Sequence, residues 1–351
     1  MSLMSRQIFS YSNHSRFTNP EVFVSGKNDT VTNADDKTYI DCNSGLWNVN
    51  FGYNNPMYTP TTDLHYYPTH FWSSTESTEL AAEQICKWFG YDRVFFGHSG
   101  SDAIDTSIYI AKYYTGKTDI LAYSVGYHGT NTQASVYDSY TALLDAVNSN
   151  TAAVIIEPIM ITNGVIEFDK QTLQQLFDLK QQYDFCIIFD ETVTALGRGD
   201  YSFDYKPDIL IASKGLTNGV FPLSATMVNA DIGSYIKNTD RVFSHGYTMS
   251  GHPQGSHALL QTIKQVEDMK YQLIDLQNAF CKQLNEHNLD YTNKGLVFGI
   301  HVENGIYIRR ELQKQGYLIR QANNTLLFLP MFIADHNDYT RFFDLVATLS
   351  K

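Results

Sequence analysis

The sequence has few features of a disulfide-bonded, zinc-binding or nucleic-acid-binding protein. Its four cysteines are widely separated and none lies in a Cys-x-x-Cys pair, which argues against a disulfide framework and against a metal site. Lysine and arginine number 25 against 37 acidic residues, so the formal charge is −12 and no basic run is long enough to bind a phosphate backbone. We therefore expect small-molecule partners and no nucleic acid.

Long apolar runs are also absent. No stretch of about 18 apolar residues could span a membrane, and no signal peptide is recognisable, which predicts a cytoplasmic protein without membrane contact. Hydrophobic residues nevertheless make up 43% of the 351 residues and aromatic residues 14%, which is ample for a packed interior. Because one domain usually has about 100–200 residues, a chain of this length predicts two domains.

Short apolar runs alternate with helical patterns through the middle of the chain. Continuous apolar runs indicate strands that are covered on both faces, and their alternation with helices predicts a mostly parallel α/β sheet. The strands are expected at 94–96, 120–122, 153–156, 186–189 and 209–211, and the helices at 76–89, 101–115 and 170–182.

The two ends of the chain are expected to build a smaller α+β domain. A long helical stretch runs from about 256 to 287, and strand-like runs follow at 296–302 and 326–329. The predicted organisation is a small domain formed by 1–45 and 263–351, and a large domain formed by 46–262.

In open α/β sheets, ligands bind beyond the carboxyl ends of the strands, so the segments that follow the strands are the candidate site. Residues 97–103 lead from a strand into a helix, and the Gly100-Ser101 step offers backbone N–H groups and a hydroxyl to a phosphate. The structural alternative for this segment is a plain helix N-cap.

An acid and a lysine each follow an apolar run. Asp190 ends the run 186–189, where it could hold a charged nitrogen of a cofactor, cap a helix or form a structural ion pair. Lys214 comes soon after the run 209–211. Desolvation at this position would lower the pKa of the amine and make it nucleophilic. The alternative interpretation is a lysine in a surface loop. With the phosphate segment, these residues supply what pyridoxal phosphate (PLP) requires: a phosphate site, a pyridinium partner and a Schiff-base lysine.

In their order along the chain, these segments resemble the motifs of the class III aminotransferases of PLP fold type I. The resemblance runs from about residue 40 to 262 and returns near 316–333. It implies PLP as cofactor, a homodimer with a shared active site, and ping-pong transfer of an amino group from an amino donor to a keto acid, ketone or aldehyde. The motifs that carry it are Ser99-Gly100-Ser101-Asp102-Ala103, Gly126-Tyr127-His128-Gly129, Ile156-Glu157-Pro158-Ile159, Asp190-Glu191, Gly197-Arg198, Ser213-Lys214 and His245-Gly246-Tyr247-Thr248.

The resemblance also implies a role for each residue of the cofactor site. Gly100 and Ser101 would hold the phosphate, and Tyr127 would stack on the pyridine ring. Asp190 would pair with the pyridinium nitrogen, and Lys214 would form the Schiff base and then move the proton between Cα and C4′.

Four further positions complete the implied cofactor site. His128 belongs to the same motif as Tyr127, and Glu157 would have a supporting or substrate-gating role. Thr192 occupies the position that usually carries an aliphatic side chain beneath the ring. Thr248 would reach the phosphate of the neighbouring subunit, which is the basis for expecting a homodimer.

Within the family, the sequence looks most like the diaminopelargonate (adenosylmethionine-8-amino-7-oxononanoate) aminotransferase branch. The runs 216–219 and 222–226 resemble that branch, and 316–320 resembles its stretch with a carboxylate-binding arginine. Arg320 would then clamp a substrate carboxylate, and Trp47 would line the substrate pocket. The structural alternatives are a surface arginine and a core aromatic residue.

The sequence departs from the family pattern in several places. The chain is shorter than usual, because both the segment between Gly129 and Ala152 and the C-terminal domain are reduced. Racemisation, an aminomutase reaction and decarboxylation would use the same Asp190 and Lys214, and a non-catalytic PLP-binding protein is a further alternative. The motifs alone do not separate these reactions.

Overall fold

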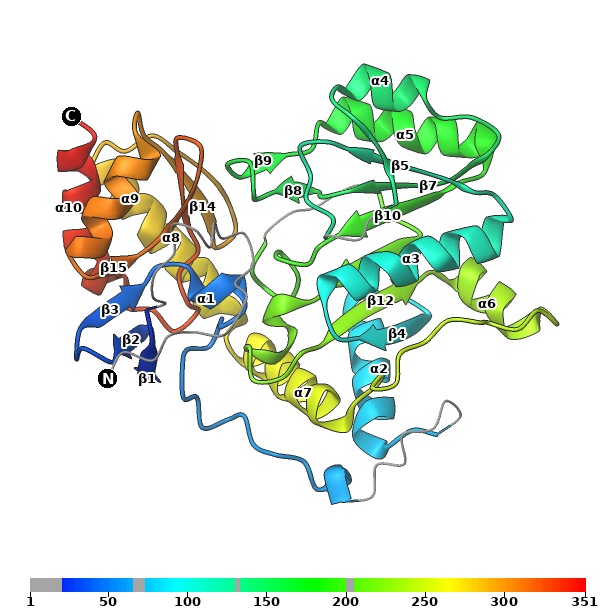
Figure 1. The fold of residues 1–351 in the computed structure, drawn as a ribbon, viewed down its shortest axis with the longest axis horizontal. Helices are drawn as coiled ribbons and strands as arrows, with labels where there is room; N and C mark the ends of the chain where they lie inside the picture. The colour runs from blue at the N-terminus through cyan, green and yellow to red at the C-terminus, as the bar shows by residue number, and fades with distance from the viewer. Residues whose placement is uncertain (1–20, 66–72, 130–132, 200–204) are drawn as a thin grey trace.

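The computed structural model describes residues 21–65, 73–129, 133–199 and 205–351. Figure 1 shows two bodies side by side. The larger one is a sheet between helices, and the smaller one contains strands and helices from both ends of the chain, coloured blue and orange to red. Among the described residues, no helix is long and apolar enough to cross a membrane.

A seven-stranded sheet forms the centre of the large body. Its strand order is β4-β12-β11-β10-β7-β5-β6. The inner pairs are parallel, as predicted, except that β12 is antiparallel to both of its neighbours. The strands are β4 (Arg93–Gly97), β5 (Asp119–Tyr123), β6 (Ser135–Tyr137), β7 (Thr151–Ile156), β10 (Cys186–Asp190), β11 (Ile209–Ala212) and β12 (Ser224–Val228).

Helices cover both faces of this sheet, which explains why its strands are continuously apolar. Every residue of β7, β10, β11 and β12 is buried. Successive side chains of a strand point to opposite faces, so Ile188 packs with α3 on one face while Phe189 packs with α5 on the other. The covering helices are α2 (Glu76–Phe89), α3 (Gly100–Thr115), α4 (Tyr140–Asp145), α5 (Lys170–Tyr183), α6 (Ala230–Asn238) and α7 (Pro253–Asp268).

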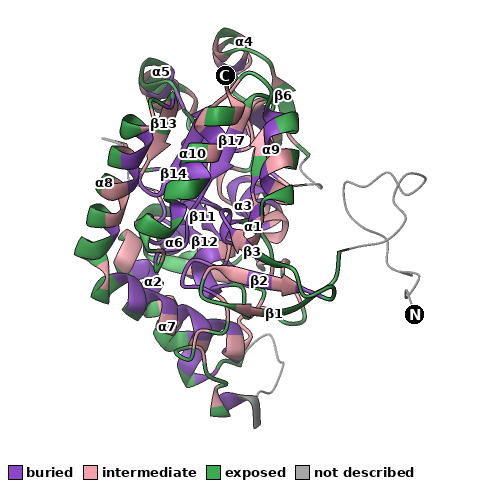
Figure 2. Cartoon of the chain, turned by 90° about the vertical axis from the view of Figure 1, so that its left-hand side faces the viewer, coloured by how far each residue is buried: buried purple, intermediate pink, exposed green. Residues whose placement is uncertain are grey.

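The small body joins the two ends of the chain. In one four-stranded sheet, β15 (Tyr317–Leu318) pairs with β3 (Thr38–Asp41) beside β2 (Thr30–Asn33) and β1 (Phe23–Lys27). Figure 2 shows β14 and β17 of the second sheet in purple, so its centre is buried. The other elements are β13 (Tyr291–Lys294), β14 (Val297–His301), β16 (Arg320–Ala322), β17 (Thr325–Phe328), α8 (Lys270–Glu286), α9 (Gly305–Lys314) and α10 (Thr340–Leu349).

Some details differ from the sequence-based expectations. The helical stretch expected at 256–287 is two helices, α7 and α8, which meet at Met269. Strand β12 was not expected. The predicted domain boundary at 262 falls within α7, and residues 1–20 of the predicted segment 1–45 lie outside the described residues. The division into domains therefore stays a prediction.

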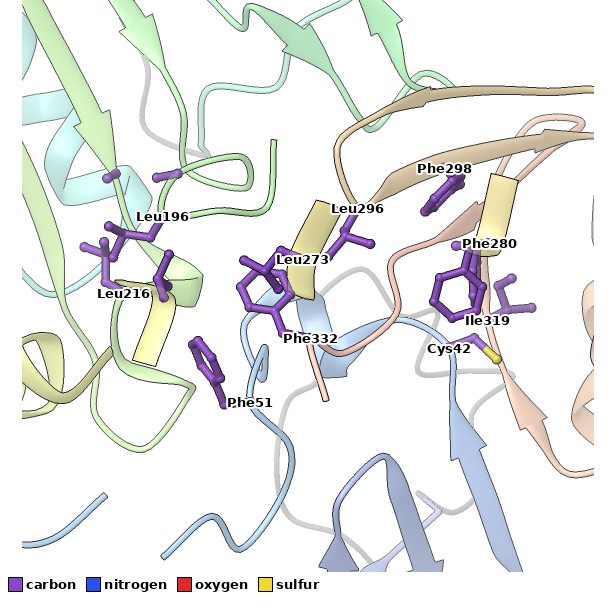
Figure 3. Close-up of a cluster of buried hydrophobic side chains, with 14 of the residues drawn as sticks. Cys42, Phe51, Leu196, Leu216, Leu273, Phe280, Leu296, Phe298, Ile319 and Phe332 are labelled. Atoms are coloured by element: carbon purple, nitrogen blue, oxygen red, sulfur yellow. The ribbon is translucent and has the colours of Figure 1, made fainter. Parts of the chain in front are cut away.

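A continuous cluster of buried side chains fills the junction between the two bodies (Figure 3). Phe51, which follows α1 (Ser44–Trp47), packs edge-on against Phe332 from the C-terminal region, with ring centroids 5.2 Å apart. The members of the cluster that the figure labels are Cys42, Phe51, Leu196, Leu216, Leu273, Phe280, Leu296, Phe298, Ile319 and Phe332.

Arg198 is buried completely within this junction. Its guanidinium donates hydrogen bonds to the carbonyl oxygens of Leu296 (3.3 Å) and Pro330 (2.5 Å), to Ser44 Oγ (3.1 Å) and to Asn50 Oδ1. Burial lowers the pKa of Arg198 to about 9, so the group stays protonated at neutral pH. One side chain thus connects segments that are far apart in the sequence.

We expect Arg198→Ala to lower the free energy of unfolding by about 3–5 kcal/mol, because it leaves buried acceptors unsatisfied and opens a cavity. Urea denaturation of both proteins measures the difference. Arg310→Ala, on the exposed face of α9, is the control and should change the value by no more than about 0.5 kcal/mol. Equal stability of the Arg198 and Arg310 variants would contradict the connecting role of Arg198.

Candidate active site

The segments that follow the sheet strands surround one cavity of about 220 Å³, as the rule for ligand sites in α/β sheets predicts. Its walls come from the segments after β4, β5, β7, β10 and β11, and from α1. The lining residues are Leu46, Trp47, Ser99, Gly100, Ser101, Ile104, Tyr127, Gly129, Glu157, Ile159, Thr162, Asp190, Thr192, Val193, Thr194 and Lys214.

Lys214 lies two residues beyond β11, in a backbone conformation with φ +41° that L-residues rarely adopt. Burial lowers the pKa of its amine, while the negative charges of Asp190 and Glu157 oppose this effect. A lysine in such surroundings carries a neutral, nucleophilic amine more readily than a surface lysine does. The structure thus excludes the surface-loop alternative for Lys214.

The Asp190 carboxylate is buried and held by three hydrogen bonds. His128 Nδ1 lies 3.1 Å from Oδ2, and both the backbone N–H (3.1 Å) and the hydroxyl (2.5 Å) of Thr192 donate to Oδ1. Burial acts to raise the pKa of Asp190, but the hydrogen bonds and the charge of His128 outweigh it, so the pKa lies below its ordinary value. Asp190 is therefore a fixed negative charge in the cavity.

Glu157 supplies a second buried carboxyl group, but its pKa moves in the opposite direction. It follows β7 and accepts a hydrogen bond from the backbone N–H of Tyr127. Burial, together with the negative charge of Asp190, raises the pKa of Glu157 to about 7. The cavity thus contains one permanently ionised carboxylate and one that changes protonation near neutral pH.

The start of α3 is closely packed against Thr192 and against Gly129, which follows β5. Ser99 caps the helix by accepting the Asp102 N–H at 3.2 Å. A Cβ atom at Gly100 would lie 3.1 Å from the Thr192 side chain, and one at Gly129 would lie 2.6 Å from Ser101 Oγ. Ser99, Gly100 and Ser101 line the cavity, so the N-terminus of this 16-residue helix borders it, as an anion site requires.

Trp47 joins the cavity to the small body. Its side chain is buried, and its ring centroid lies 4.9 Å from Lys214 Nζ and 5.5 Å from Arg320 Cζ. Trp47 also belongs to a core cluster with Ile159 and Val297, so the pocket and core-aromatic interpretations both apply. Arg320 does not line the 220 Å³ cavity itself.

Thr248 is the one predicted cofactor residue that lies apart from the others. It is exposed, in the loop between α6 and α7, and it does not line the cavity of its own chain. Sequence reasoning missed Leu46, Thr162, Val193 and Thr194, which do line it. Among the described residues, no group of three or more His, Cys, Asp or Glu side chains could hold a metal ion.

The comparisons with known proteins agree with this geometry. The sequence matches the family Aminotransferase class-III over residues 11–139 and 130–349. It is 27% identical to the acetylornithine aminotransferase of Lactiplantibacillus plantarum, over 93% of both proteins. It is also 27% identical to the beta-alanine–pyruvate aminotransferase of Pseudomonas aeruginosa, over 93% of this chain and 91% of that protein. The fold matches the PMP-bound aminotransferase of Vibrio fluvialis with a TM-score of 0.85, at 21% identity, covering 98% of this chain and 95% of that one.

The fold and the cavity define a PLP-dependent transaminase, an enzyme that acts on small-molecule amino donors and acceptors. The chain belongs to the class III aminotransferase family. The residues present fit PLP, since a buried lysine, a buried ionised carboxylate and a helix N-terminus border a single cavity. The resemblance to the diaminopelargonate branch is a finer assignment than these comparisons show.

We expect Thr192→Val to destabilise the protein by about 1.5–3 kcal/mol at pH 7, because the Asp190 carboxylate loses a charge-assisted hydrogen bond. The low pKa of Asp190 stabilises the fold above the pKa of an unfolded aspartate, and this contribution is lost as the pH falls through the pKa of the folded state. The difference between variant and wild type should therefore shrink toward pH 3. Urea denaturation at several pH values measures it.

Thr192→Ser keeps the hydroxyl and is the matched control, which should stay close to wild type in its dependence on pH. A destabilisation by Thr192→Val that is the same at every pH would show that the loss comes from packing, and not from the carboxylate.

Proposed function

We propose that Lys214 is the Schiff-base lysine of this aminotransferase and that Asp190 is the partner of the PLP ring nitrogen. The observation that carries this proposal is that a lysine with a lowered pKa and an aspartate with a lowered pKa line the same cavity. Bound PLP supplies an electron sink for the electrons released when a proton leaves the amine-bearing carbon.

The protein's own groups then have distinct tasks. The Lys214 amine, which desolvation makes easier to deprotonate, takes up and returns the proton at the reacting carbon. Asp190 keeps its negative charge because His128 and Thr192 hold it, so it keeps the ring nitrogen protonated. Gly100 and Ser101, at the start of α3, bind the phosphate through backbone N–H groups and a hydroxyl.

Tyr127 and Thr192 border the cavity where the ring of the cofactor would lie between them. Tyr127 lines the cavity and keeps 44% of its surface exposed in the single chain, and we assign it the contact with one face of the ring. The hydroxyl of Thr192 is occupied by Asp190, which leaves its methyl group for the contact usually made by an aliphatic residue. The pKa of Glu157 is about 7, so a charged group that enters the cavity would change the protonation of this carboxyl group.

For the substrate, we propose an amine that carries a carboxylate, bound with the help of Arg320 and Trp47. The names of two relatives contain such amines, acetylornithine and beta-alanine. The sequence features of the diaminopelargonate branch also fit this class, because Arg320 lies over Trp47 at the edge of the active site. S-adenosylmethionine as the donor would distinguish that branch from the others.

The first test is the absorption spectrum of the purified protein with PLP, before and after glutamate, lysine, beta-alanine or S-adenosylmethionine is added. We expect an absorption band of protein-bound PLP that one of these donors converts to the pyridoxamine form. Lys214→Ala should lower turnover by about 10²–10⁴-fold or more and leave the fold intact. Borohydride reduction followed by mass spectrometry should locate PLP on Lys214.

Lys264→Ala, on the exposed face of α7, is the control and should keep wild-type turnover. Wild-type turnover by Lys214→Ala would overturn the assignment. Product analysis tests the other reactions: a racemised, isomerised or decarboxylated donor, without transfer of the amino group, would show that the scaffold performs different chemistry.

We also propose a homodimer in which Thr248 contacts the phosphate bound by the neighbouring subunit. The exposure of Thr248, away from the cavity of its own chain, supports this arrangement. A mixture of Lys214→Ala and Thr248→Ala subunits tests it, because a mixed dimer would contain one site with both residues intact. Equal mixing should restore about one quarter of wild-type activity at limiting PLP, as expected for random exchange in a two-fold dimer.

Activity of the mixture that is no higher than the average of the separate variants would show that Thr248 does not act across a subunit interface. Sedimentation of the wild-type protein establishes independently whether the chain forms a dimer.

A further inference from the structure

Residues 239–252 connect α6 to α7 and carry Thr248. In the described part of the chain, no backbone-to-backbone hydrogen bond joins residues 240–249 to a helix or a strand. The position of this connecting segment therefore depends on contacts that involve side chains.

One face of α3 supplies these contacts. Tyr113 donates its hydroxyl hydrogen to the carbonyl oxygen of Arg241 at 2.6 Å, and the Tyr109 hydroxyl accepts the Ser244 N–H at 2.8 Å. Two further contacts lie closer to the start of the helix, so the segment follows α3 from its last turn toward its first. The α3 residues that make contact are three or four positions apart, as neighbours on one helix face are, and they are Asp102, Thr106, Tyr109 and Tyr113.

His245 is enclosed by aromatic rings and by a buried hydroxyl group. Its Nε2 lies 2.9 Å from Oγ1 of Thr106, a residue that is completely buried. The imidazole ring stacks on Tyr109, with centroids 4.9 Å apart, and contacts Phe95 of β4 at 5.5 Å. Burial lowers the pKa of His245, so the ring is neutral at pH 7, and the Thr106 hydroxyl can donate to Nε2 or accept from it.

Thr248 is the second residue of a turn that begins at Tyr247. The Tyr247 carbonyl oxygen accepts the Ser250 N–H at 3.1 Å, and the Tyr247 N–H donates to Ser250 Oγ at 3.2 Å. The Tyr247 hydroxyl donates to the carbonyl oxygen of Asp102 at 3.2 Å, and its ring meets His245 edge-on at 5.2 Å. Because His245 and Tyr247 are half-buried against α3 while Thr248 is exposed, the anchored residues set where Thr248 lies.

We propose that His245 is a positioning residue, which holds Thr248 at the phosphate bound by the neighbouring subunit. The inference rests on the proposed function, since it requires that Thr248 makes this contact. The helix that anchors His245 also begins with Gly100 and Ser101, the residues assigned to the phosphate of its own subunit. A single helix, α3, thus supports the phosphate sites of two subunits.

The test uses Thr106→Val, which removes the hydroxyl beside His245 and keeps the branched shape of the side chain. Absorption titration of the full-length protein with PLP measures the affinity. PLP affinity should fall about 2- to 10-fold, the range expected for the loss of one hydrogen bond. Affinity for pyridoxal, which has no phosphate, should change less than about twofold, because Thr248 has nothing to bind on it.

Two further variants separate the hydrogen bond from the packing. Thr106→Ser keeps the hydroxyl and should retain the PLP affinity of the wild type. His245→Phe keeps a ring against Tyr109 but lacks Nε2, so it should behave like Thr106→Val and supplies the same measurement if that variant does not fold.

A double variant shows whether the effect passes through Thr248. Thr248→Ala should weaken PLP binding about 10- to 100-fold, as expected for a hydrogen bond to a charged group. Adding Thr106→Val to Thr248→Ala should then weaken it by less than about twofold more. A merely structural loss would instead add in full to that of Thr248→Ala.

Thr262→Val is the matched control, because Thr262 is a buried threonine of α7 whose hydroxyl lies 2.9 Å from the Tyr58 hydroxyl. It should leave PLP affinity unchanged. Wild-type PLP affinity in folded Thr106→Val and His245→Phe, an equal loss for PLP and pyridoxal, or fully additive losses would each overturn the positioning role. Unchanged PLP affinity in Thr248→Ala is a different result, since it would show that the proposed contact between subunits is absent, and the inference would fall with it.

Discussion

The active site depends on one buried cation that is not itself part of the cavity. Arg198 holds Ser44 and Asn50, which flank Trp47 in sequence, against the carbonyl oxygens of Leu296 and Pro330. Because water is excluded from this junction, each of these hydrogen bonds must be kept or a buried polar group is left unsatisfied. These hydrogen bonds hold the turn that carries Trp47, whose ring centroid lies 4.9 Å from Lys214 Nζ.

Within the cavity, the opposing pKa changes follow from one low-dielectric environment. Burial favours the neutral forms of Lys214 and Glu157, whereas three hydrogen bonds keep Asp190 ionised despite its burial. A fixed negative charge beside an amine that deprotonates readily is the combination that PLP chemistry uses. Thr192 is part of this arrangement because its hydroxyl is committed to Asp190.

The residues predicted for the cofactor and the substrate do not all line the cavity. Asp190 and Lys214 line it, whereas His128 contacts Asp190 without lining the cavity, and Arg320 and Thr248 do not line it in the single chain. The small body has a separate cavity of about 390 Å³, whose lining includes Asp41, Arg309 and Arg320.

The sequence by itself determined the elements whose signals are local. Continuous apolar runs predicted β7, β10 and β11, which the structure confirms, because a strand covered on both faces is apolar at every position. The step from strand to helix at Gly100 was likewise predicted from neighbouring residues, and α3 begins there. Strand β12 escaped notice because Ser224 and Thr226 interrupt its apolar pattern. Only the tertiary structure decided that Arg198 is buried and that the Trp47 ring lies beside Lys214 Nζ. These relations join residues far apart along the chain, and only packing between the two bodies brings them together.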